Sequence, residues 1–87
     1  MIGMNDKVIF KDPSISNLIY TVTDRIGFGP FAKNNLIGFN DQPKIVFQNN
    51  IKNKDLIKLK SEDVFLITKD YVSVDDIREK YFRSDKK

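Results

Sequence analysis

The sequence predicts a small, mainly β domain, an open barrel of five to six short antiparallel strands with one C-terminal α-helix. Short apolar runs, bounded by turn residues, follow one another from residue 7 to residue 67, and this spacing is typical of small barrels. Near the C-terminus the apolar period becomes helical. A chain of 87 residues supplies apolar material for one core, so we expect a single domain.

The first part of the predicted barrel contains two strands. Residues 1–6 are expected to be a flexible start, and residues 7–11 form the first apolar run. An Asp-Pro-Ser sequence at 12–14 ends that run, because proline cannot donate a hydrogen bond to a neighbouring strand. In residues 18–23, β-branched and aromatic side chains alternate, which predicts a strand with one buried face.

Two further segments predict a hairpin. Residues 36–39 and 44–48 are apolar runs, and the polar sequence Asn-Asp-Gln-Pro at 40–43 predicts the turn between them. A second turn is expected at residues 49–50, because asparagine tolerates the left-handed conformation better than most residues. The alternative fold is a β-sheet with the helix across one face.

The last part of the chain predicts two strands and a helix. Residues 56–59 and 64–67 are the remaining apolar runs and would complete a barrel over residues 7–67. A helix is predicted over residues 73–83, because Ser73 is a favoured N-cap and aspartates follow in the first turn. Residues 84–87 are expected to be a frayed basic tail.

A turn rich in glycine and aromatic residues lies between the second and third predicted strands. Gly27 and Gly29 permit positive φ and Pro30 fixes φ, so together they predict a sharp, ordered turn. A rigid turn presents aromatic rings at low entropic cost, so we predict that Phe28, Pro30 and Phe31 bind a partner. The alternative is that the turn is only a structural corner.

Residues 25–32 (RIGFGPFA) resemble the start of the KOW motif of transcription elongation factors and ribosomal proteins. In that family a strand runs into a Gly-Pro-Phe-Ala or similar turn, and a glycine follows a few residues later. Here Leu36 or Asn35 stands at the place of that glycine, and Gly38 comes about two residues late. The resemblance implies an SH3-like barrel.

Four lysines at even positions predict a second candidate surface. If the segment is extended, Lys52, Lys54, Lys58 and Lys60 share one face. Together with Arg25, this stripe could neutralise successive phosphates of a nucleic acid. The alternative is that the lysines protect an edge strand from aggregation.

The composition argues against catalysis. The chain has neither cysteine nor histidine, which removes thiol nucleophiles, zinc sites built on these residues and the usual general base at neutral pH. The carboxylates Asp75, Asp76 and Glu79 have no nucleophile or phosphate-binding loop beside them. We expect no catalytic residue, no metal and no cofactor.

These observations predict a small non-enzymatic protein-binding domain. Lysine, asparagine and isoleucine are frequent, which indicates an A- and T-rich genome, either that of a bacterium or that of a phage or mobile element within one. For a phage- or mobile-element-encoded chain, we expect a modulator of a host macromolecular machine. Its partner would be a host protein or a second copy of itself. The alternatives are a nucleic-acid-binding protein that uses the lysine stripe and a self-assembling phage protein. No apolar run approaches about 20 residues, so we expect a cytoplasmic protein without membrane contact.

Overall fold

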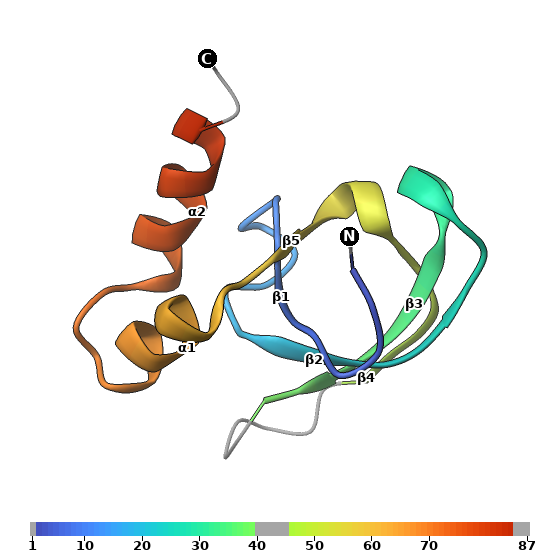
Figure 1. Ribbon diagram of the computed structural model, residues 1–87, viewed down its shortest axis with the longest axis horizontal. Helices are drawn as coiled ribbons and strands as arrows, with labels where there is room; N and C mark the ends of the chain where they lie inside the picture. Colours follow the sequence, from blue (N-terminus) through green and yellow to red (C-terminus); the bar gives the residue numbers. More distant parts are fainter. Residues whose placement is uncertain (1, 40–45, 85–87) are drawn as a thin grey trace.

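The computed structural model describes residues 2–39 and 46–84 (Figure 1). Its centre is a five-stranded antiparallel sheet with the strand order β4-β3-β2-β1-β5. The strands are β1 (Lys7–Phe10), β2 (Tyr20–Ile26), β3 (Lys33–Gly38), β4 (Val46–Lys52) and β5 (Leu56–Lys58). Two short 3-10 helices, η1 (Gly29–Phe31) and η2 (Asn53–Asp55), precede β3 and β5. Two α-helices, α1 (Ser61–Thr68) and α2 (Val74–Ser84), follow β5, so the fold is mixed α and β.

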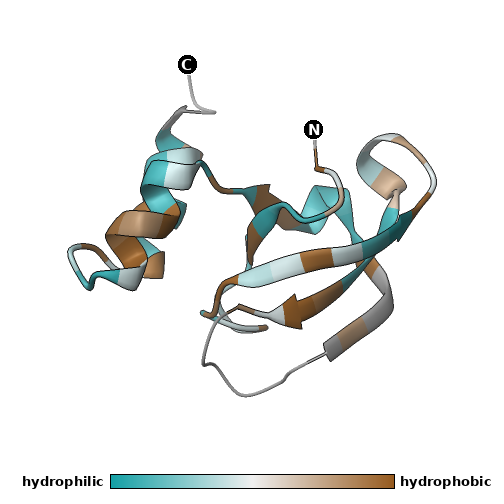
Figure 2. Ribbon diagram, turned by 60° about the horizontal axis from the view of Figure 1, so that its bottom comes forward, coloured by the Kyte–Doolittle hydropathy of each residue, from teal (hydrophilic) through white to brown (hydrophobic). Residues whose placement is uncertain are grey.

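Strand β1 is buried on both of its faces. Val8 and Phe10 belong to one apolar cluster and Ile9 to another, because successive side chains of a strand point to opposite faces. The first cluster is enclosed by the curved sheet, and its aromatic rings of Phe10, Tyr20 and Phe47 have centroids 5.3 to 5.6 Å apart. The second cluster lies against the helices and includes Ile77. In Figure 2 hydrophobic and hydrophilic segments accordingly alternate along the strands.

The predicted flexible start is wrong for the described residues 2–6. Ile2 is buried in the first cluster. The Asn5 amide donates to the Val22 carbonyl at 2.8 Å, and the Val22 amide donates to the Asp6 carbonyl at 3.0 Å. This segment therefore pairs alongside β2, and the buried side chain of Ile2 helps to close the core.

The predicted strand at residues 64–67 is wrong, because this run lies in α1. Four consecutive apolar residues fit a strand and a buried helical turn equally well. The N-terminal boundary decides between them: the Asp63 carboxylate accepts a hydrogen bond from the Lys60 amide at 3.3 Å, as a residue in the first helical turn does. The sheet thus ends at Lys58, and the described part of the chain contains two α-helices where one was expected.

The predicted hairpin is present, since Leu36 pairs with Phe47 and Ile37 with Val46. The predicted turn at residues 49–50 is wrong, because β4 continues through these positions to Lys52. The predicted turn at 40–43 and the start of the fourth strand at 44–45 lie outside the described residues.

The helix predicted over residues 73–83 is present as α2. The Ser73 hydroxyl accepts the Asp76 amide at 3.0 Å, and the Asp76 carboxylate accepts the Ser73 amide at 3.0 Å. This reciprocal capping satisfies two amides that have no partner within the helix. Within the described residues, neither helix combines the length and hydrophobicity that a membrane crossing requires.

Candidate functional site

The aromatic turn, residues 28–31, joins β2 to β3 on the side of the sheet away from α1 and α2 (Figures 1 and 2). Gly27 and Gly29 have φ angles of 94° and 69°, in the left-handed region that disfavours other side chains. Pro30 occupies the first turn of η1, where its missing amide proton is not needed. The turn geometry inferred from these residues is therefore present.

Two asparagines hold the turn in place. The Asn53 backbone amide donates to the Ala32 carbonyl at 2.9 Å, and the Asn53 side chain donates to the Gly29 carbonyl at 3.0 Å. The buried Asn34 side chain in turn donates to Asn53 Oδ1 at 2.7 Å and to the Ile51 carbonyl at 3.0 Å. Since these bonds connect η1 to η2 and β4, the turn is fixed at both of its ends.

Sequence reasoning missed this pair. Asn34 lies two positions before the buried Leu36 in the same strand, so both side chains point inward. A polar residue at such an inward-facing position was the signal that the sequence offered. Nothing in the sequence marked Asn53, because its role depends on a contact with residues 24 positions earlier.

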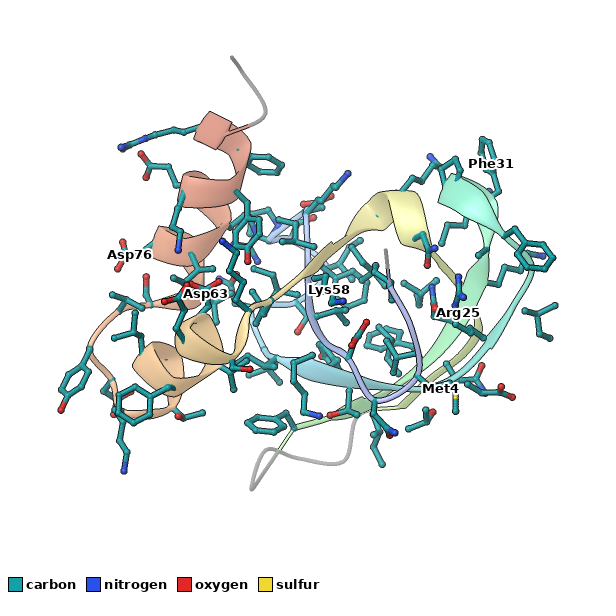
Figure 3. The ribbon with its side chains drawn as sticks, viewed as in Figure 1. Met4, Arg25, Phe31, Lys58, Asp63 and Asp76 are labelled. Atoms are coloured by element: carbon teal, nitrogen blue, oxygen red, sulfur yellow. The ribbon has the colours of Figure 1, made fainter. Side chains whose placement is uncertain are left out.

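The turn presents its aromatic rings to solvent. Phe28 is 94% exposed and Phe31 is 64% exposed, and Ile26 beside them is 62% exposed. Phe31 points away from the molecule at its edge (Figure 3). Pro30 is also exposed and lines a shallow hollow of 320 Å³ with Ile2, Gly29, Asn53 and Lys54. The three residues predicted to bind a partner are therefore all accessible to solvent.

Lysines lie beside the rings. Lys33 and Lys52 are directly paired across β3 and β4, so their side chains project from the same face. The Lys52 ammonium lies 5.7 Å from the centroid of the Phe31 ring, within range of a cation–π interaction. Lys54 follows in η2 and borders the hollow next to Pro30.

The lysine stripe predicted from the sequence is not continuous. The 3-10 helix η2 interrupts the extended backbone, so even positions do not remain on one face. Lys52 and Lys54 lie near the aromatic turn, whereas Lys58 lies 3.4 Å from Asp6 and Lys60 precedes α1. The predicted stripe is therefore two separate pairs of lysines, Lys52 with Lys54 and Lys58 with Lys60.

Arg25 is placed differently from the lysines. It pairs with the buried Asn34 across β2 and β3, so its side chain shares the inward face of the sheet. Its Nε atom is buried, and it and Asn34 Oδ1 have no hydrogen-bond partner.

A buried carboxylate connects the two helices. Asp63 is fully buried and accepts hydrogen bonds from Lys80 Nζ at 2.9 Å and from the Tyr81 hydroxyl at 2.7 Å (Figure 3). Burial opposes ionisation of Asp63, but these bonds and that from the Lys60 amide outweigh it and lower its pKa. Burial and the neighbouring Asp63 raise the pKa of Tyr81 to about 12. The polar groups of Asp63, Lys80 and Tyr81 bond to one another, which favours a structural role for this cluster.

A buried arginine attaches α2 to the sheet. Arg78 donates through Nε to the Phe10 carbonyl at 2.8 Å, through Nη1 to Asp75 at 2.5 Å and through Nη2 to the Ser16 carbonyl at 3.5 Å. Nothing in the sequence distinguished Arg78 from an exposed helical arginine.

The remaining candidate carboxylates have structural partners. Asp75 contacts Arg78, Asp76 caps α2 and Glu79 pairs with Arg83. In residues 2–39 and 46–84, no group of three potential metal-ligating side chains comes together.

Tyr20 and Tyr71 lie in contrasting surroundings. Tyr20 is fully buried, and its hydroxyl lies 2.7 Å from Ser16 Oγ, so it is a core residue. Tyr71 is 69% exposed and contacts Phe65 edge to face, on the helical side of the molecule.

Comparison with protein-family models, with curated proteins and with solved structures found no match to this chain.

Proposed function

We propose that this chain is a small non-enzymatic binding domain and that the aromatic turn is the surface by which it holds another macromolecule. We also propose an SH3-like barrel for its strands. The antiparallel succession of β2, β3 and β4, and the return of β5 to β1, support that assignment.

The near-complete exposure of Phe28 is the observation that carries the proposal. A phenylalanine ring in water is unfavourable by about 25 cal/mol for each Å² of apolar surface, yet this ring is 94% exposed beside Phe31 and Ile26. The turn is held by Asn53, so it presents the rings without a large loss of entropy when a partner binds. Rigid aromatic anchors of this kind dominate many binding interfaces.

The proposal is tested by capture from a lysate with immobilised wild-type chain and with the double variant Phe28→Ala/Phe31→Ala, before and after nuclease treatment. We expect the double variant to retain its stability, since both rings are exposed, and to lose the captured partner. A matched control is Phe65→Ala/Tyr71→Ala, which removes the exposed aromatic pair on the helical side. If the turn variant unfolds, or captures the same partners as the wild type, the aromatic turn is not the binding surface.

A further inference from the structure

We infer that the ligand of the aromatic turn is a single-stranded nucleic acid. This inference rests on the proposed function, because it concerns the same surface. It joins three observations: the opposed pair Lys33 and Lys52, the two exposed phenylalanine rings, and the outward row that Ile26 forms with both lysines.

The opposed lysines are the first step. Lys33 and Lys52 face each other directly on β3 and β4, an arrangement in which like charges repel. Lys54 adds a third cation at the border of the turn, and Asp55 at 3.8 Å from it is a weak counter-charge because both side chains are about half exposed. A ligand with regularly spaced negative charges would remove this repulsion, and a phosphate backbone has such charges.

The rings are the second step. Phe28 and Phe31 expose most of their surface, and Lys52, which pairs with Lys33, lies 5.7 Å from the centroid of the Phe31 ring. Aromatic side chains in a cationic groove bind single strands, because an unpaired base offers a flat face for stacking. The bases of a duplex are stacked on one another, so the surface should prefer single strands. An acidic protein segment satisfies the lysines equally well but lacks a series of flat rings for both phenylalanines.

The candidate residues lie in one row across the end of the sheet. Ile26, Lys33 and Lys52 are successive cross-strand neighbours on β2, β3 and β4, so they form one outward row at the end of the sheet. The neighbouring row contains Arg25, Asn34 and Ile51 and faces inward. The nucleic-acid surface therefore includes Lys33, which the sequence did not indicate, and leaves out Arg25, Lys58 and Lys60.

The test is fluorescence anisotropy of the full chain with labelled oligothymidylate and oligouridylate of about 12 nucleotides, at 50 and 200 mM salt. With three phosphate contacts, affinity for a single strand should fall about twentyfold between these concentrations. Phe28→Ala should weaken binding by about ten- to a hundredfold. Lys33→Gln/Lys52→Gln should weaken binding and make the salt dependence less steep, whereas the matched control Lys11→Gln/Lys69→Gln should do neither.

Absence of binding at 50 mM salt overturns the inference. Equal affinity for a duplex, or binding that the lysine variants weaken and Phe28→Ala does not, also overturns it, because the contact is then purely electrostatic. If no oligonucleotide binds but the turn variant loses a protein captured after nuclease treatment, the proposed function stands and the partner is a protein. If no oligonucleotide binds and the turn variant captures the same proteins as the wild type, the proposed function fails as well.

Discussion

The Asp63 carboxylate should make a large contribution to stability because it connects α2 to the start of α1. The substitution Asp63→Ala removes the acceptor for Lys80, Tyr81 and the Lys60 amide. Hydrogen bonds to a charged group contribute about 1.5–3 kcal/mol each. The Lys80 side chain is 52% exposed, so solvent screening reduces the contribution of its bond to Asp63 to about 0–1 kcal/mol.

The contact with Lys60 is long, at 3.3 Å, and we assign it the lower end of the range for neutral hydrogen bonds. Together the three bonds predict a loss of about 3 kcal/mol for Asp63→Ala. In a domain of this size such a loss lowers the melting temperature by about 12–24 °C. Urea denaturation followed by circular dichroism measures it, with Glu62→Ala as control, an exposed carboxylate one residue away that should change stability by less than about 0.5 kcal/mol.

The same contact has a pH dependence with a definite sign. The pKa of Asp63 is lowered in the folded chain, so its contribution is fully present above the unfolded pKa of about 4 and is lost as pH falls through the folded pKa. The stability difference between wild type and Asp63→Asn should therefore shrink below about pH 4. The reasoning is refuted if Asp63→Ala costs less than about 1 kcal/mol at pH 7, or if the difference grows in acid.

Other substitutions test the turn and the attachment of α2. Asn53→Ala should leave the sheet folded but speed hydrogen exchange at the Ala32 amide, which bonds to the Gly29 carbonyl that Asn53 also holds; unchanged exchange would mean that the turn is rigid without it. Gly29→Ala should cost about 1 kcal/mol in urea denaturation, because φ is 69° and an added Cβ meets no atom within 4 Å; a loss of several kcal/mol would point to a clash. Arg78→Met should cost about 2 kcal/mol, because the buried Phe10 carbonyl loses its donor; a neutral result would indicate that water replaces the guanidinium.

Local signals were sufficient where they agreed with one another. The alternation in residues 18–23 predicted the central strand β2, and Ser73 with the following aspartates predicted the start of α2. The glycine and proline positions predicted the turn at 28–31, since only glycine adopts its φ angles freely. In each case the interaction partners lie within a few residues in sequence.

Other elements were mispredicted because their conformation depends on distant residues. The run at 64–67 begins a helix at the Asp63 cap, and Val64 and Ile67 then pack against the second apolar cluster with Ile77, a contact that the apolar pattern of the run does not encode. The lysine stripe assumed a straight strand, but η2 turns the chain so that Asn53 can reach Gly29. Asn34 and Arg78 are buried polar residues whose partners lie 19 and 68 positions away.

The sequence by itself showed that this chain supplies no thiol and no imidazole group, because it contains neither cysteine nor histidine. It also determined the sharp turn that carries Phe28 and Phe31, because backbone preferences of glycine and proline are local. Only the tertiary structure decided that these rings are exposed and that Lys52, paired with Lys33, lies next to Phe31. Exposure and charge proximity depend on which strands pair and in which register, and that is set by the packing of the whole chain.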